Sequence, residues 1–153
     1  MRKIFKYTAL AVVLFLVAAQ FIRPELTNPP VNPDATFEAI AKPQPAAASI
    51  MKRACYDCHS NNTVWPWYSQ VAPVSWLVAD DVNEGRAHLN FSEWGLLGPE
   101  VSQKRLEAVC KEIKGGEMPL MQYLLIHSEA KLTPEEVNTV CNATAPSAAG
   151  YVR

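Results

Sequence analysis

A cluster of prolines divides this chain into segments that cannot share one regular fold. Six of the twelve prolines lie between residues 23 and 45, at positions 24, 29, 30, 33, 43 and 45. Proline fixes the backbone φ angle and lacks an amide N–H, so neither a long helix nor a central strand can form there. The sequence therefore predicts three parts: residues 1–22, a Pro-rich linker over residues 23–45, and a folded domain over residues 46–153.

Residues 1–22 have the pattern of an export signal or a membrane anchor. Basic residues stand at positions 2, 3 and 6, and residues 7–22 carry no charge. A helix over that uncharged run rises about 24 Å, short of the roughly 30 Å hydrocarbon core, although the flanking Lys6 and Arg23 can snorkel. Val17–Ala19 would suit signal cleavage, whereas the apolar run beyond it favours a retained anchor, the interpretation we prefer. The domain would then lie in the periplasm beside the inner membrane.

The charge balance of the remainder restricts its partners. Without the basic N-terminus the chain has 11 Lys and Arg residues against 15 Asp and Glu residues. Because no basic stripe remains to neutralise phosphate groups, nucleic acid is not an expected partner. A domain of roughly 100 residues has only a modest core, and a large prosthetic group could supply apolar surface that the side chains lack.

Helical patterns dominate the sequence after the prolines. Residues 46–54 contain no helix breaker, place apolar side chains on one helical face and lead directly into Cys55. A second helix is predicted to begin at Pro73, because proline is well tolerated in the first turn of a helix, and Gly85 is its expected stop. These segments indicate short helices rather than strands.

The C-terminal part of the sequence continues this pattern. Pro99 predicts the start of a helix that ends at Gly115-Gly116, and a short helix is expected within residues 120–127. Thr133 and Glu136 have the spacing of a capping box, which marks the start of a last helix. Since no segment alternates between apolar and polar residues as a half-buried strand does, the sequence predicts an all-α fold.

A cysteine motif follows the first of these helices. Residues 55–59 are Cys-Tyr-Asp-Cys-His, the C-x-x-C-H pattern of c-type haem attachment. Two thiols three positions apart on a helical turn can reach the two vinyl groups of one macrocycle, and the next residue directs its imidazole at the iron. The motif therefore predicts one covalently bound haem c, held by Cys55 and Cys58, with His59 as the proximal iron ligand.

Three other uses of these cysteines compete with haem attachment. A thioredoxin-like redox pair would require a preceding strand, whereas a helix is predicted here. A structural zinc site needs four ligands, but Cys110 and Cys141 are far apart in the sequence and form no second close pair. A disulfide within the motif would leave His59 without a role and would close too short a loop to add much stability.

Cys110 and Cys141 lie on two predicted helices, each beside an apolar stripe. Outside the cytoplasm they could oxidise to a disulfide that closes a loop of about 30 residues, worth roughly 3 to 4 kcal/mol when the entropy of the unfolded chain alone is considered. Two unpaired buried thiols are the alternative. The disulfide is the interpretation we favour.

The sixth iron position determines what kind of haem protein this is. Met118 is the leading candidate, because it precedes Pro119 and so lies in a loop held extended by the proline. Methionine opposite histidine is a common arrangement in electron-transfer proteins and raises the reduction potential. His127, near the end of an apolar run, is the chief rival, followed by Met121 and His88. Each of these side chains could instead pack in the core, and an open iron site is a further alternative.

Aromatic residues follow the motif closely, namely Trp65, Trp67, Tyr68 and Trp76. Their flat, largely apolar rings suit the lining of a macrocycle, and indole N–H groups could donate to a haem propionate. Trp65, Trp67 and Tyr68 are therefore predicted to contact the cofactor. Ordinary core packing explains the same residues equally well.

Four segments of the chain have specific sequences: Cys55–Ser60, Trp65–Tyr68, Asn90–Trp94 and Gly116–Pro119. With the residues around them they resemble the bacterial haem-binding domain family of short, N-terminally anchored C-x-x-C-H proteins. The resemblance covers nearly all of the chain after Arg23. It implies a cytochrome c-like fold and a haem carrier found alongside respiratory or peroxidase-type cytochromes. Many members have a proline where this chain has Met121, which places a second thioether near Met118.

These observations predict a membrane-tethered monohaem c-type cytochrome that passes single electrons between redox partner proteins in the periplasm. Such a carrier needs no substrate site, and enzymatic activity is not expected. The alternative is a haem-based gas or redox sensor, in which the sixth ligand is weak or absent. A small peroxidase would also need an open iron and a distal acid–base residue, a role for which His127 or His88 would have to serve.

Overall fold

The computed structural model describes residues 1–144, and residues 145–153, the end of the predicted domain, lie outside the described part. All regular secondary structure within residues 1–144 is helical, which confirms the predicted all-α fold. The elements in chain order are α1 (Arg2–Ala19), η1 (Pro33–Ala35), α2 (Phe37–Ala41), α3 (Pro45–Ala54), α4 (Tyr56–His59), η2 (Trp67–Gln70), α5 (Val74–His88), η3 (Phe91–Leu96), α6 (Pro99–Gly115), α7 (Met121–Leu124), η4 (Ser128–Ala130) and α8 (Pro134–Ala143).

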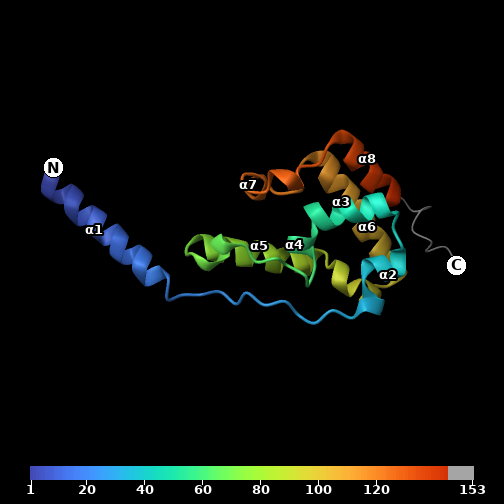
Figure 1. The fold of residues 1–153 in the computed structure, drawn as a ribbon, viewed down its shortest axis with the longest axis horizontal. Helices are drawn as coiled ribbons and strands as arrows, with labels where there is room; N and C mark the ends of the chain where they lie inside the picture. The colour runs from blue at the N-terminus through green and yellow to red at the C-terminus, as the bar shows by residue number, and fades with distance from the viewer. Residues whose placement is uncertain (145–153) are drawn as a thin grey trace.

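Helix α1 projects away from the other helices (Figure 1). Its large apolar side chains are exposed from Ile4 to Val17, whereas Ala19 at its end is buried. Two hydrogen bonds join this end to the domain, because the Gln20 side chain donates to the Ala72 carbonyl at 3.0 Å and accepts from the Ala72 N–H at 3.1 Å. Among residues 1–144, no helix combines the length and the apolar character needed to cross a membrane.

The Pro-rich segment is bound to the domain along its length. From the end of α1 it runs along one side of the domain to α2 at the far end (Figure 1). Arg86 of α5 donates to the Thr27 carbonyl at 3.0 Å and to Asn28 Oδ1 at 2.7 Å. Phe37 at the start of α2 is only 1% exposed. The domain boundary predicted at residue 46 therefore needs correction, because the predicted linker supplies a core side chain.

An aromatic cluster forms the core at this far end. Phe37 meets Trp94 edge-on, with ring centroids 4.9 Å apart, and Phe91 stacks on Tyr56 at 4.9 Å. Met51 of α3 is fully buried against them. Each buried side chain of this size contributes about 1.5–3 kcal/mol relative to an exposed one. This close-packed core thus supports the residues of the cysteine motif, because Tyr56 belongs to it and Cys55 packs against it.

A disulfide joins α6 to α8. Cys110 and Cys141 are bonded, with 5.0 Å between their Cα atoms. The predicted bridge is therefore present, and the alternative of two unpaired thiols does not hold. The bridge closes a loop of 31 positions that contains the whole segment from Gly116 to Thr133. It consequently restrains the C-terminal helix on the core.

Two predicted helix ends are confirmed. Helix α8 begins at Pro134 with both bonds of the capping box, since the Glu136 N–H donates to Thr133 Oγ1 and the Thr133 N–H donates to Glu136 Oε2. Helix α6 ends at Gly115, and Gly116 follows with φ +76°, a left-handed conformation that glycine adopts without strain. These ends follow from local sequence alone.

The predicted stop at Gly85 is wrong, because α5 continues through this residue to His88. A Cβ atom built at Gly85 would lie 2.6 Å from the backbone carbonyl oxygen of Cys58. Glycine is therefore needed here for the close approach of α5 to α4, not for ending a helix. This contact holds the cysteine motif directly against α5.

Candidate functional site

A cavity of about 660 Å³ lies between two walls that meet at the cysteine motif. Helices α4 and α5 provide one wall, whereas the opposite wall consists of residues 118–127 and part of α6. The volume is within the usual range for small-molecule and cofactor sites, roughly 300–1,000 Å³. In Figure 1 the two arms that carry α5 and α7 extend from the core on the same side of the domain.

Both cysteines of the motif line this cavity, and both are free thiols. Burial raises the pKa of the Cys55 thiol to about 12, and burial together with the nearby Asp81 and Asp57 carboxylates raises that of Cys58 to about 11. A thioredoxin-like pair needs a thiol with a lowered pKa, so these values argue against that function. The disulfide between the other two cysteines also removes them as zinc ligands.

His59 lines the same cavity, and its ring is held by the backbone of α5. Its Nδ1 lies 2.9 Å from the Gly85 carbonyl oxygen and 3.1 Å from that of Leu89. Because a carbonyl can only accept, Nδ1 must carry the proton, which leaves the lone pair on Nε2 free to bind a metal. Burial lowers the pKa of His59 and so favours the neutral imidazole that coordination requires.

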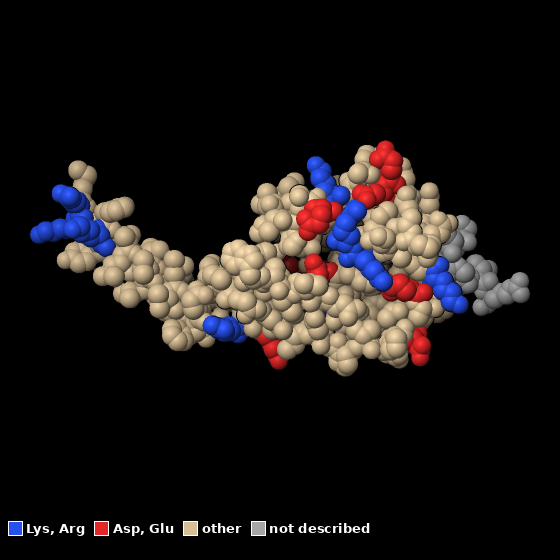
Figure 2. All heavy atoms as spheres, viewed as in Figure 1, with Lys and Arg blue, Asp and Glu red and all other residues tan. Residues whose placement is uncertain are grey.

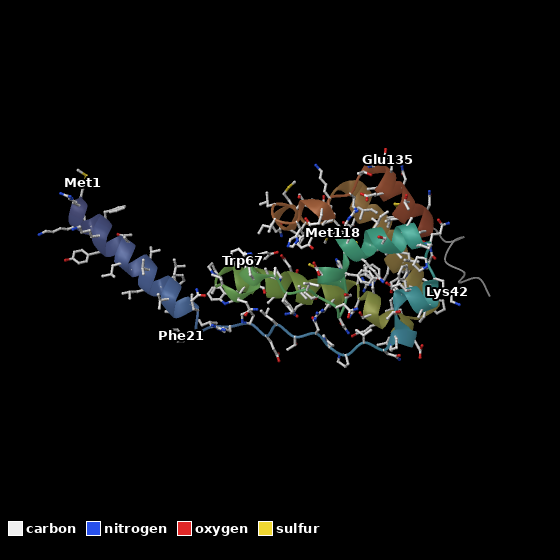
Figure 3. All side chains as sticks on the ribbon, in the orientation of Figure 1. Met1, Phe21, Lys42, Trp67, Met118 and Glu135 are labelled. Atoms are coloured by element: carbon white, nitrogen blue, oxygen red, sulfur yellow. A yellow bond between two sulfur atoms is a disulfide. The ribbon has the colours of Figure 1, made fainter. Side chains whose placement is uncertain are left out.

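Met118 lines the cavity from the opposite wall and is half-buried. It packs against the core cluster and lies near the middle of the domain (Figure 3). Met121, by contrast, is 73% exposed and does not line the cavity. Of these two neighbouring thioethers, the one on the cavity is therefore Met118.

His127 also lines the cavity, but both of its ring nitrogens have partners. Its Nε2 lies 2.7 Å from the Tyr68 hydroxyl, and its Nδ1 donates to the Glu129 carboxylate at 3.0 Å. Coordination through either nitrogen would break one of these hydrogen bonds. His88 lines the cavity at the C-terminal end of α5 and is exposed.

The aromatic residues predicted to contact a cofactor are not placed alike. Tyr68 lines the cavity, whereas Trp65 and Trp67 do not. Trp67 is 79% exposed, and Trp65 packs beside the Arg86 guanidinium, 5.9 Å from the ring centroid. Within the described residues the buried indole N–H of Trp65 has no hydrogen-bond acceptor. Spacing after the motif therefore identified one lining residue of the three.

Tyr123 is a cavity residue that sequence reasoning missed. Its hydroxyl donates to Asp57 Oδ2 at 2.9 Å, and its ring stacks on His127 with centroids 4.2 Å apart. Asp57 is the third residue of the cysteine motif and also accepts from the Val64 N–H. The hydrogen bond thus connects the motif to the opposite wall. The only sequence signal for Tyr123 was its helical spacing from His127.

Gln122 of α7 and Asp81 of α5 both line the cavity. Burial, with the neighbouring Asp80 and Glu84, raises the pKa of Asp81, whereas the Gln122 side chain acts to lower it. Two side-chain hydrogen bonds, Tyr123–Asp57 and His127–Tyr68, fasten residues 120–127 over the cavity.

Comparison with known proteins adds one match. Residues 14–145 match the model of a family described as "Haem-binding domain". The matched region includes the cysteine motif, both walls of the cavity and Met118. No curated protein and no solved structure matches the chain.

Proposed function

The chain belongs to the haem-binding domain family, and on this premise we propose that it is a membrane-tethered monohaem c-type cytochrome that carries single electrons in the periplasm. The observation that carries the proposal is one cavity with Cys55, Cys58 and His59 on one wall and Met118 on the other. The donor set fits a haem c, which needs two thiols and two axial ligands.

Cys55 and Cys58 would hold the haem covalently, and His59 and Met118 would bind its iron. When bound, haem supplies reversible one-electron chemistry at its iron. The hydrogen bonds from His59 Nδ1 to two carbonyls fix the ring orientation and the tautomer. A thioether opposite an imidazole favours a high reduction potential.

The packing around the two ligands suits an electron carrier. Gly85 lets α5 lie directly on the motif, so the His59 side is rigid. Leu89 and Ile113 add apolar side chains to the lining of the cavity. A carrier of this kind exchanges electrons with partner proteins through small, transient interfaces, which usually bury less than about 1,200 Å². No substrate need bind, and we propose no enzymatic activity.

The proposal places the domain outside the inner membrane, with α1 as its anchor. Support comes from the exposed apolar side chains of α1 and from its basic N-terminal residues. Figure 2 shows that basic residues gather at the end of α1 farthest from the domain. The disulfide in the domain fits an oxidising compartment such as the periplasm.

Absorption spectra of the haem-loaded protein and two variants test the function. We expect Met118→Ala to abolish the sulfur-to-iron charge-transfer band of the oxidised protein, because its ligand is gone. His127→Ala should keep the band and serves as the matched control from the same wall. We also expect no carbon monoxide binding by the reduced native protein. Rapid carbon monoxide binding would contradict the electron carrier and favour the gas or redox sensor.

A further inference from the structure

Exposed apolar side chains surround the open end of the cavity. They come from η2 and the residue after it, from the first turn of α5 and from the residues after α7. We call them the apolar rim: Trp67, Val71, Val74, Leu77, Leu125 and Ile126. Trp67 and Leu125 are each 79% exposed. Val74, Leu77 and Ile126 also line the cavity, so the rim and the cavity mouth are continuous.

The rim lies beside the C-terminal end of α1. The reciprocal hydrogen bonds between Gln20 and Ala72 join this end of α1 to the residue next to Val71. Trp76 directly precedes Leu77 of the rim, and its indole N–H donates to the Ile22 carbonyl at 2.7 Å. Figure 1 shows both arms of the domain extending toward the side from which α1 leaves. Figure 3 places Trp67 on that side as well.

The chemistry of the rim indicates a lipid surface. None of its six side chains is charged. On the face that Figure 2 shows, the end of the domain nearest to α1 carries fewer charged side chains than the opposite end, apart from a basic and an acidic group where α1 meets the domain. Apolar patches on a soluble surface mark protein or membrane contacts. Continuity with the exposed apolar surface of α1 favours the membrane, and tryptophan is common at the level of lipid headgroups. Because the rim has no Lys or Arg, anionic headgroups are not required.

We propose that the apolar rim rests in the interface of a zwitterionic lipid bilayer beside α1, so that the cavity mouth faces lipid rather than water. This inference rests on the proposed membrane tether. Gln20 and Trp76 hold the rim at the depth where α1 leaves the bilayer. The far end, with the aromatic core and the disulfide, then points away from the membrane. Water-soluble partners would meet the domain from its other sides.

Photolabelling by lipid tests this orientation. The full-length, haem-loaded chain is placed in phosphatidylcholine nanodiscs that contain a phosphatidylcholine with a diazirine close to the headgroup. After illumination, mass spectrometry identifies the labelled peptides. We expect labels in α1, in residues 67–77 and in residues 120–126, and none in residues 91–101. Labels confined to α1 would overturn the inference and leave the tether standing, whereas absence of label in α1 would remove the tether as well.

A pair of matched variants checks that the rim side chains are responsible. Trp67→Ser with Leu125→Ser changes two rim residues that do not line the cavity. Leu96→Ser with Val101→Ser changes two exposed apolar residues of η3 and α6. We expect the first pair to lose the labels of residues 67–77 and 120–126 while α1 stays labelled, and the second pair to keep them. Equal labelling of both pairs would contradict the proposed contact.

Discussion

The two ends of the domain are built differently. At the end far from α1, Phe37, Phe91 and Trp94 are each at most 1% exposed, and a disulfide ties α8 to α6. At the end near α1, two arms surround the cavity, and α7 has no buried residue. Side-chain hydrogen bonds of Tyr123 and His127, rather than a packed core, fasten residues 120–127 over the cavity.

Because of this difference, one end of the domain supplies most of the stability and the other end supplies the cavity. Apolar burial is the largest favourable contribution to folding, and most of it lies at the aromatic end. The cavity end keeps apolar surface available for a prosthetic group and its neighbours. His59, the proposed iron ligand, lies at the junction, where α4 and α5 are in close contact and the Gly85 carbonyl holds its ring. On the opposite wall, residues 120–127 are held by polar links and can adjust when the cavity is filled.

The largest expected effect comes from Phe37→Ala at the aromatic end. Removal of this buried ring leaves a cavity, and we expect the free energy of unfolding to fall by about 3–5 kcal/mol in urea titrations of the haem-loaded protein. Phe21→Ala is the matched control, because Phe21 is 85% exposed and should change this value little. A loss below about 1 kcal/mol for Phe37→Ala would show that the Pro-rich segment is not part of the core.

Replacement of both Cys110 and Cys141 by serine should have the next largest effect. The disulfide closes a loop of 31 positions, and its loss restores entropy to the unfolded chain worth about 3–4 kcal/mol. Urea titration measures this change. Since the bridge lies at the core end, we expect the visible spectrum of the bound haem to stay unchanged. An altered haem spectrum of this double variant at low urea concentration would show that loss of the disulfide at the core end also changes the cavity end.

Gly85→Ala tests the junction between the two ends. The added Cβ would clash with the Cys58 carbonyl, and moving α5 away from α4 should cost about 1–3 kcal/mol of stability. The control is Gly115→Ala at the end of α6, where the new Cβ meets only Glu117 Cγ at 3.7 Å. Alanine favours a helix, so this control should be neutral or slightly stabilising. Similar values for both variants would contradict the close approach at Gly85.

The smallest effect on overall stability is expected from Tyr123→Phe in the cavity arm. Loss of its half-exposed hydrogen bond to Asp57 should cost less than about 1.5 kcal/mol while amide exchange in residues 121–127 becomes faster. Tyr56→Phe removes a hydroxyl that donates to Glu38 at 2.7 Å at the core end. That control should cost more stability and leave exchange in the arm unchanged. Unchanged amide exchange in residues 121–127 of Tyr123→Phe would contradict the conclusion that hydrogen bonds hold this arm in place.

Local sequence signals predicted part of this structure well. The capping box at Thr133, the helix start at Pro99 and the helix end at Gly115-Gly116 depend on neighbouring residues alone, and all are present. The cysteine motif likewise fixed the position of three cavity residues, because a helical turn sets their spacing. The all-helical architecture followed from the absence of alternating segments.

Contacts between distant segments could not be derived in this way. Gly85 has the local pattern of a helix stop, and only the position of Cys58 explains it. Phe37 lies among prolines, and its burial depends on Phe91 and Trp94, more than fifty positions later. The outward turn of Trp67 and the contact of Tyr123 with Asp57 depend on how the arms fold. All of these features depend on contacts between residues that are far apart in the sequence.

The proposed function depends on covalent attachment of one haem to the chain, which mass spectrometry of the intact protein can test. The chain is produced in a host that matures c-type cytochromes, and the haem is challenged with acidic acetone. We predict that the mass of one haem stays on the chain and maps to the peptide that contains Cys55 and Cys58. Release of the haem into acetone, or a peptide with both thiols unmodified, would contradict the account.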